Sequence, residues 1–215
     1  MHTILKFNEI VCRMIVIADS EASNYYANYT KKSWEDLGIK VNFFDAITPD
    51  KIQKSKTLNF SKYSTATKYA TKNIKKVISE TEKACWHSHY FLWEECYFSN
   101  EPILVLEHDS MLIHPENLWM EDSYGIIFFD AAAMGSYILT PKFAKKLIIK
   151  ARTTKISTGP YGFIHEFGSS VVNIRHKKFK IASNQVMSKK YGNTINHYEG
   201  LIETDFVGHN FILID

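Results

Sequence analysis

The sequence predicts an α/β fold with a mainly parallel central sheet. Short apolar runs alternate with longer helix-forming stretches along most of the chain, as in successive strand–helix–strand units. One run, residues 102–106, is wholly apolar, as expected for a parallel strand that is covered on both faces. Because 215 residues, 45% of them hydrophobic, can bury one sizeable core, we expect a single domain over residues 1–215.

The first third of the chain contains two predicted strands with a helix between them. Residues 14–18 are apolar and predict a strand, and residues 24–37 predict a helix that Gly38 ends. Residues 41–44 predict the second strand. The stretch 50–66 is polar and rich in Lys, Ser and Thr, which is typical of a long loop.

The rest of the chain continues the alternation. Residues 68–82 predict a polar helix, and residues 84–98 predict an aromatic helix in which Trp86, Tyr90 and Trp93 serve the core. We expect further strands at 102–106, 124–129 and 136–140, and a helix at 142–151 that begins next to Pro141.

The acidic triplet Glu107-His108-Asp109 follows the apolar strand directly. Open α/β sheets bind ligands at the carboxyl ends of their strands. Two carboxylates at i and i+2 offer hard oxygen ligands that suit Mg²⁺ or Mn²⁺ carrying a diphosphate. The alternative is a solvated acidic turn.

Charge and cysteine content limit the class of protein. The net charge is only +3, but the segment Lys142–Lys190 holds twelve Lys or Arg and one acid, Glu166. This segregation favours a surface for DNA or another polyanion, with ordinary Lys-rich helices as the alternative. The odd set Cys12, Cys85 and Cys96 predicts buried free thiols in a reducing compartment. With no 18-residue apolar run and no signal-peptide pattern, we expect a cytoplasmic protein, in the host cytoplasm if it is phage-encoded.

Four segments then resemble glycosyltransferase family 25, which includes lipopolysaccharide and collagen glycosyltransferases. Residues 82–93, EKACWHSHYFLW, resemble the family helix E-x-G-C-x-x-S-H-x-x-x-W, and residues 103–109, ILVLEHD, resemble its A-L-I-L-E-D-D strand. Residues 37–46 and 135–147 resemble two further elements, and the matches fall in order over roughly residues 12–150. The departures are Ala84 for the family glycine, His108 for the middle acid, and residues 18–23, ADSEAS, where the family is Arg-rich.

The resemblance implies a GT-A-like, Rossmann-like nucleotide-diphosphosugar transferase domain. Its donor-binding and metal-binding part would span residues 12–150, and its acceptor side residues 151–215. The implied donor is a nucleotide sugar, with UDP-sugar preferred, and the implied cofactor is Mn²⁺ or Mg²⁺. The residues implied to line the donor are Asp19, Ser20, Asp45, Ala46, Ser88, His89 and Glu107.

The same resemblance implies the metal ligands, whereas the candidates for the catalytic base come from their positions in the sequence. Asp109 would ligate the metal directly, and Glu107 would bind it through water or hold the ribose. His209 or His197 would add a ligand, unless each is an ordinary loop residue. The base that takes the acceptor proton would be Asp130 or Glu166. A turn cap is the alternative for Asp130, and a salt bridge to a nearby lysine is the alternative for Glu166.

The hypotheses for sugar transfer differ in the acceptor that receives the sugar. The basic segment and the aromatic residues Tyr161, Phe163 and Phe167 favour 5-hydroxymethylcytosine in phage DNA, which an enzyme would extract from the base stack. A lipopolysaccharide or other glycan acceptor is the alternative. Hypotheses of other classes are a non-enzymatic nucleic-acid-binding α/β domain and a metal-dependent nuclease or phosphatase.

Overall fold

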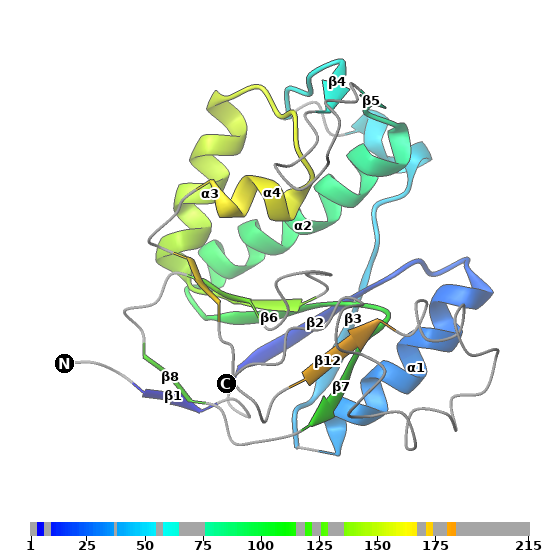
Figure 1. Cartoon of the computed structure of the whole chain (residues 1–215), viewed down its shortest axis with the longest axis vertical. Coiled ribbons are helices and arrows are strands. Elements are labelled where there is room, and N and C mark those ends of the chain that lie inside the picture. The colour runs from blue at the N-terminus through cyan, green and yellow to red at the C-terminus, as the bar shows by residue number, and fades with distance from the viewer. Residues whose placement is uncertain are drawn as a thin grey trace.

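A central sheet between two helical layers organises the chain. The computed structural model describes residues 4–6, 10–36, 38–54, 58–64, 76–114, 119–121, 126–128, 136–166, 171–173 and 180–183. Helix α1 (Glu21–Glu35) covers one face of the sheet (Figure 1). Helices α2 (Glu80–Ser99), α3 (Pro141–Thr153) and α4 (Pro160–His165) cover the other face. This arrangement confirms the predicted α/β class.

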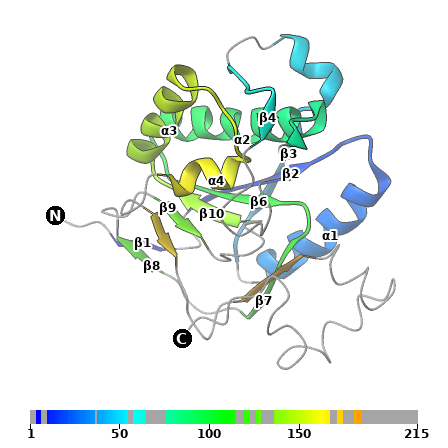
Figure 2. The same ribbon diagram turned by 45° about the horizontal axis from the view of Figure 1, so that its top comes forward.

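The sheet runs in the order β11-β9-β10-β6-β2-β3. The strands β2 (Val11–Val16), β3 (Val41–Asp45) and β6 (Ile103–Glu107) are mutually parallel. β10 (Ser136–Leu139) is antiparallel to both β6 and β9 (Ile126–Phe128), and β11 (Val171–Asn173) is parallel to β9. The three mutually parallel strands therefore lie at the β3 side, and β10, between β6 and β9, runs antiparallel to both of its neighbours (Figure 2).

Smaller elements surround this sheet. Three two-stranded pairs are formed by β1 (Ile4–Lys6) with β8 (Trp119–Glu121), β7 (Ser110–His114) with β12 (Lys180–Ser183), and β4 (Tyr63–Ser64) with β5 (Lys76–Val77). A 3₁₀ helix, η2, spans Pro49–Lys54. The stretch 50–66, predicted as a loop throughout, thus contains η2 and β4 within its described residues.

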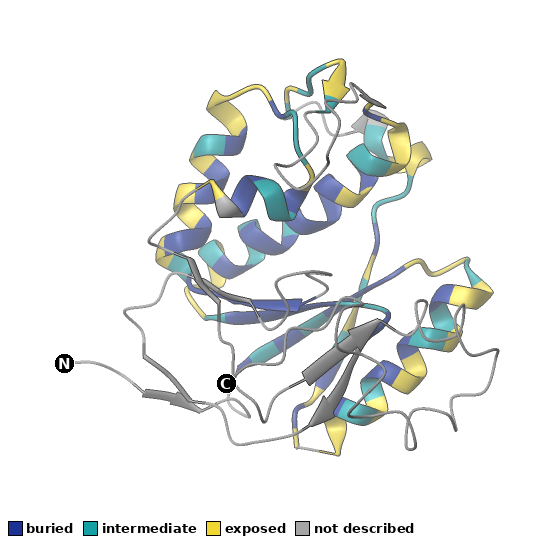
Figure 3. Ribbon diagram, in the orientation of Figure 1, coloured by how far each residue is buried: buried dark blue, intermediate teal, exposed yellow. Residues whose placement is uncertain are grey.

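Strand alternation sends the side chains of β6 into two separate cores. Ile103 and Val105 pack in a cluster with the aromatic side chains of α2, whereas Leu104 and Leu106 pack in a cluster with Trp34 of α1. Successive strand residues point to opposite faces of a sheet, so a buried strand must be apolar on both. Figure 3 shows the buried residues concentrated along β6 and along the faces of α2 and α4 that meet the sheet.

Local signals in the sequence explain the helix boundaries. Ser20 caps α1 by accepting a hydrogen bond from the Ser23 backbone, and Gly38 takes a positive φ of 77° just beyond the helix. Ser79 and Glu82 form a complete capping box at the start of α2. Pro141 occupies the first turn of α3, where its missing N–H costs nothing.

The predicted polar helix at 68–82 is wrong at its carboxyl end. Lys76 and Val77 are extended in β5, and the helix begins only at Glu80, because the Ser79 capping box starts a new helix there. Residues 65–75 lie outside the described residues. The predicted strands at 14–18, 41–44, 102–106 and 136–140 and the helix at 142–151 are confirmed with shifts of up to three residues at their ends.

None of the helices in the described part of the chain combines the length and the apolar character that a membrane span requires.

Candidate active site

The carboxyl ends of three parallel strands meet at one edge of the sheet. The register pairs Ile15 with both Phe44 and Glu107, so β3, β2 and β6 end at the same level. Neighbouring strands lie about 4.8 Å apart, which places the ends of β3 and β6 roughly 10 Å apart with β2 between them. This edge is where open α/β sheets bind ligands, and it gathers several of the predicted donor-binding residues.

Asp19, Ser20, Asp45 and Ala46 lie at the ends of β2 and β3. The side chains of Asp19 and Asp45 are exposed, Ser20 caps α1, and Ala46 is buried. The Ala46 N–H donates to the Val16 carbonyl at 2.9 Å, which holds the two strand ends together beyond the ladder. The structure therefore brings these four residues to one edge, while their contact with a nucleotide stays a prediction.

Glu107 ends β6 and points towards the α2–α4 layer. Tyr161, in the first turn of α4, donates its hydroxyl hydrogen bond to Glu107 Oε1 at 2.6 Å. His89 Nε2 of α2 lies 3.6 Å from the same oxygen, an ion-pair distance rather than a hydrogen bond. The other ring nitrogen of His89 lies 2.9 Å from the Tyr137 hydroxyl of β10, which also accepts from Trp93 Nε1 at 2.9 Å.

This network controls the charge on Glu107. Burial by itself would raise the pKa of the carboxyl group, but His89 and Tyr161 outweigh burial, and the pKa of Glu107 is lowered. Burial and then the charge of Glu107 raise the pKa of Tyr161 well above its usual value, so Tyr161 stays a hydrogen-bond donor. Glu107 is thus an ionised, oriented carboxylate that is still partly exposed at the strand end.

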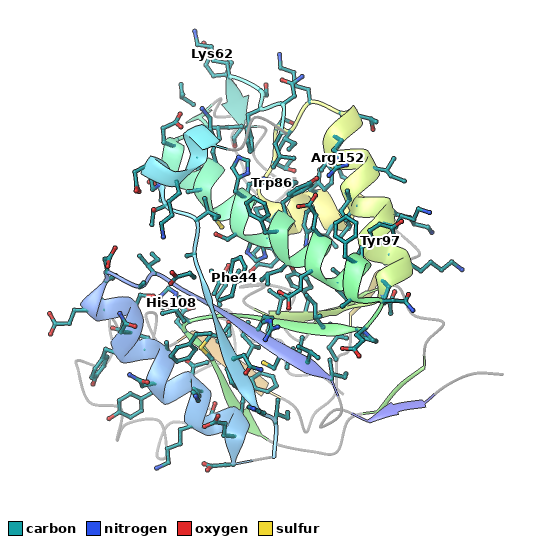
Figure 4. All side chains as sticks on the ribbon, turned by 180° about the vertical axis from the view of Figure 1, so that it is seen from behind. Phe44, Lys62, Trp86, Tyr97, His108 and Arg152 are labelled. Carbon is teal, nitrogen blue, oxygen red and sulfur yellow. The ribbon has the colours of Figure 1, made fainter. Side chains whose placement is uncertain are left out.

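The three side chains of the triplet Glu107-His108-Asp109 have different surroundings. His108 faces α1, where its ring lies 6.5 Å from that of Tyr26, and Figure 4 shows His108 on the opposite side of the sheet from Trp86. Asp109 is buried, with 8% of its surface exposed, and leads into β7. Glu107 ends β6 and Asp109 lies in the turn between β6 and β7, and metal binding by Asp109 stays a prediction.

The family resemblance implies a donor-binding role for Ser88 and His89 of α2, and the two side chains make different contacts. Ser88 is buried, accepts a hydrogen bond from the Ile47 backbone at 2.9 Å and donates to the Ala84 carbonyl at 3.1 Å. Ser88 therefore ties α2 to the segment after β3, and its contact with a donor stays a prediction. His89 reaches Glu107 directly, and the predicted core residues Trp86, Tyr90 and Trp93 are confirmed as buried.

Cys85 is exposed, contrary to the prediction of three buried thiols, and its sulfur lies close to His89 and Glu107. All three cysteines are free, and Cys12 and Cys96 are buried as predicted, but Cys85 is exposed. Cys85 precedes His89 by one helical turn, on the side of α2 that faces the end of β6. Its Sγ, a ring nitrogen of His89 and a carboxylate oxygen of Glu107 all lie within 4.8 Å of one another.

The predicted acceptor-side residues fall into three groups. Glu166 caps α4 and forms an ion pair with Lys150 of α3 at 2.7 Å, which agrees with the salt-bridge alternative, while its role as a base stays a prediction. Phe163 is buried between Trp86 and Trp93, so it lines the core rather than an open aromatic pocket. Asp130 and His209, like Phe167, lie outside the described residues.

Two tyrosines of the site are absent from the sequence-based donor and metal set. Tyr137 and Tyr161 belong to segments far from Glu107 in the chain, and the sheet pairing β10–β6 and the packing of α4 bring them to it. Tyr137 stands in a strand segment that resembles the family, but nothing in its spacing indicates a histidine partner. The sequence predicts Tyr161 only as part of an aromatic acceptor-side segment, and Pro160–His165 of that segment form α4.

Comparison with known proteins supports the resemblance. The sequence pattern of the family described as "Glycosyltransferase family 25 (LPS biosynthesis protein)" matches residues 26–123. The chain is 28% identical over 103 residues to the lipooligosaccharide biosynthesis protein lic2B of Haemophilus influenzae, covering 45% of this chain and 35% of that protein. The chain therefore resembles family 25 glycosyltransferases over a region that holds Asp45, His89 and the acidic triplet, and it spans about a third of this relative's length.

A solved structure gives a weaker likeness. A glycosyltransferase involved in the glycosylation of the major capsid of PBCV-1 is similar with a TM-score of 0.40 and 11% identity, covering 76% of this chain and 80% of the other. At that TM-score the likeness adds nothing to the functional argument.

Proposed function

We propose that the chain transfers a sugar from a nucleotide diphosphate sugar, with a UDP-sugar as first choice, to an acceptor hydroxyl. The observation that carries this proposal is the oriented, ionised Glu107 at the shared carboxyl edge of β2, β3 and β6. That edge lies in the region that resembles family 25. Asp19 and Asp45, exposed at the same edge, are available to the nucleotide.

Glu107 and Asp109 would hold a divalent cation at this edge. Their carboxylates are the hard oxygen ligands that Mn²⁺ and Mg²⁺ accept, and Glu107 keeps its charge because His89 and Tyr161 stabilise the carboxylate. The cation would supply Lewis-acid neutralisation of the leaving diphosphate. Tyr161 and His89 fix the orientation of Glu107, which limits how far the carboxylate can turn away from the donor.

A saccharide acceptor is favoured over DNA. The similar protein is named for lipooligosaccharide biosynthesis, which points to a glycan hydroxyl. The structure weakens the base-extraction argument because Phe163 is buried in the core, and because Lys150 and Arg152 pair with Glu166 and Glu94. A hydroxymethylated base remains the second candidate on the strength of the basic segment 142–190, whose lysines 142, 145 and 146 are exposed on α3.

The test is UDP release by the full chain from a panel of UDP-sugars with Mn²⁺. Reactions would contain a lipooligosaccharide-derived oligosaccharide, duplex DNA with hydroxymethylcytosine, unmodified DNA, or no acceptor. We expect release stimulated by the oligosaccharide, whereas stimulation by the modified DNA alone would shift the acceptor to DNA. Failure of every donor would overturn the proposed activity.

The variant Asp109→Asn sharpens this test. We expect it to reduce stimulated UDP release by about 100-fold or more, because loss of one charged group that stabilises a transition state costs several kcal/mol. Asp36→Asn, an exposed carboxylate just past the far end of α1, is the matched control and should retain activity. A non-enzymatic DNA-binding domain would instead bind DNA equally well in both variants and release no UDP.

A further inference from the structure

The geometry points to a transition-metal site formed by Cys85 Sγ, His89 Nε2 and the Glu107 carboxylate, with Zn²⁺ as the preferred ion. The three ligand atoms lie within 4.8 Å of one another. This site is distinct in chemistry from the hard-cation pair Glu107 and Asp109, because it contains a sulfur and a nitrogen ligand. The inference stands or falls independently of sugar transfer.

The fold brings these three ligands together from two elements. Cys85 and His89 are four residues apart on α2, so both side chains lie on one face of the helix. α2 covers the face of the sheet to which Ile103, Val105 and hence Glu107 point. The helix pair therefore meets the one charged side chain that ends β6, at a place where the preceding strand residues are apolar.

An unsatisfied nitrogen aims into the site. His89 is fully buried, and its Nε2 has no hydrogen-bond partner among the described residues. A buried polar atom left in this way carries a desolvation cost that a ligand would remove. Nε2 lies 3.6 Å from Glu107 Oε1, too far for a hydrogen bond and close enough for both atoms to bind one ion.

The surroundings of His89 are those of a metal-binding imidazole. Metal-bound histidines commonly use their second ring nitrogen to hydrogen-bond a fixed partner that orients the ring. His89 Nδ1 makes that contact with the Tyr137 hydroxyl at 2.9 Å, and Trp93 Nε1 holds the same hydroxyl. Tyr161 in turn fixes one oxygen of Glu107 at 2.6 Å. Two of the three ligands are thus oriented by neighbouring aromatic residues.

The ligand set selects the kind of ion. Thiolate and imidazole ligands favour Zn²⁺ and Co²⁺, whereas Mg²⁺ and Mn²⁺ prefer carboxylates and water. Three protein ligands leave a fourth position open, and the exposure of Cys85 gives solvent access to it. Binding would form metal–sulfur and metal–nitrogen bonds and release to solvent the Cys85 thiol proton and the His89 Nε2 proton, which the raised pKa of His89 keeps in place without metal, with no change in oxidation state.

Occupancy would affect the neighbouring donor edge. Glu107 is shared by both sets of ligands, so Zn²⁺ bound to Cys85 and His89 would withdraw Glu107 from a Mn²⁺-loaded donor. The expected consequence is inhibition of Mn²⁺-supported turnover by Zn²⁺.

Cobalt substitution tests the site directly. The reduced full-length chain, without nucleotide sugar, would be titrated with Co²⁺ and followed by its near-ultraviolet thiolate-to-cobalt charge-transfer absorption, and then by displacement with Zn²⁺. We expect a saturable band at one Co²⁺ per chain. We expect the band to be lost in Cys85→Ser and the Co²⁺ affinity to fall at least about tenfold in His89→Asn.

The cobalt titration has two controls, the stability of Cys85→Ser and the Co²⁺ binding of Cys12→Ala. Cys85 is exposed, so Cys85→Ser should retain the circular dichroism spectrum and melting temperature of the parent protein. Cys12→Ala removes a buried thiol on the α1 side of the sheet and should leave the band unchanged. Absence of a band in the parent protein, or its persistence in Cys85→Ser, would overturn the site. If UDP release continued in either case, the proposed function would remain.

Discussion

The two faces of the central sheet differ in what they bury. On the α1 face, the core around Cys12, Met14 and Trp34 is apolar, and the Trp34 indole N–H donates to the Ser110 carbonyl at 2.9 Å. On the α2 face, an equally buried aromatic core includes the polar groups of His89 and Tyr137. Both faces contact the same strand, β6, through alternate residues.

Polar and ionisable groups are concentrated on one face of this two-sided core. Buried polar groups need partners, and the α2 face supplies them with hydroxyl and indole groups that converge on Tyr137 and Glu107. The clustered core residues of the α1 face are mainly apolar, so we expect that face to contribute chiefly to stability. Changes on the α1 face should therefore alter stability alone, whereas changes on the α2 face should alter ligand binding as well.

Truncation in the α1 core should give the largest loss of stability. Leu104→Ala is expected to lower the free energy of unfolding by about 2–5 kcal/mol, because it removes fully buried methyl groups and leaves a cavity. Urea unfolding followed by circular dichroism would measure the loss. Ile103→Ala, the neighbouring truncation on the α2 face, is the matched comparison. A loss of the Co²⁺ band in Leu104→Ala, in protein that remains folded, would contradict the division between the faces.

Removing the hydroxyl at the centre of the polar network should cost less stability but more function. Tyr137→Phe leaves His89 Nδ1 and Trp93 Nε1 without their shared partner, and we expect the free energy of unfolding to fall by about 1–3 kcal/mol, the cost of a buried polar group left unsatisfied. We also expect a roughly 10–100-fold weaker affinity for Co²⁺ because His89 loses its orienting contact. Tyr63→Phe, an exposed tyrosine, is the control. Unchanged unfolding and Co²⁺ titrations for Tyr137→Phe would show that the network is incidental.

The ion pair at the end of α4 should matter little for stability. Glu166→Gln breaks the contact with Lys150 on a solvent-accessible surface, so we expect a change in unfolding free energy below about 1 kcal/mol. UDP release by the same variant tests the predicted catalytic base, since loss of a general base lowers the rate by about 10²–10⁴-fold. Unchanged release would leave Glu166 as a surface ion pair only.

His87 should make a small contribution to acid sensitivity. Burial lowers the pKa of His87 below its usual value, so the unfolded chain binds the proton more tightly. The associated stability is fully present above the unfolded pKa of about 6.5 and is lost as the pH falls below it. Unfolding titrations between neutral and acidic pH should therefore show a shallower decline for His87→Phe than for the parent protein. An equal decline in both would refute this assignment.

The sequence alone determined the elements and the edge of the site. Apolar runs and capping signals depend on local periodicity and side-chain hydrogen bonds, so the strands β2, β3 and β6 and the helices α1 and α3 could be predicted from neighbouring residues. The position of Glu107 after an apolar parallel strand likewise implied a place at the carboxyl edge. The capping box at Ser79 was a local signal too, and its neglect explains the misplaced start of α2.

The groups that surround Glu107 could not be identified without the three-dimensional packing of the helices. Tyr161 and His89 are 54 and 18 residues away along the chain, and they reach Glu107 because α2 and α4 pack on the same face of the sheet. Strand alternation shows which residues share a face, but it carries no information about which helix covers that face. The exposure of Cys85 and the burial of Phe163 were decided in the same way, because burial depends on packing between elements distant in sequence.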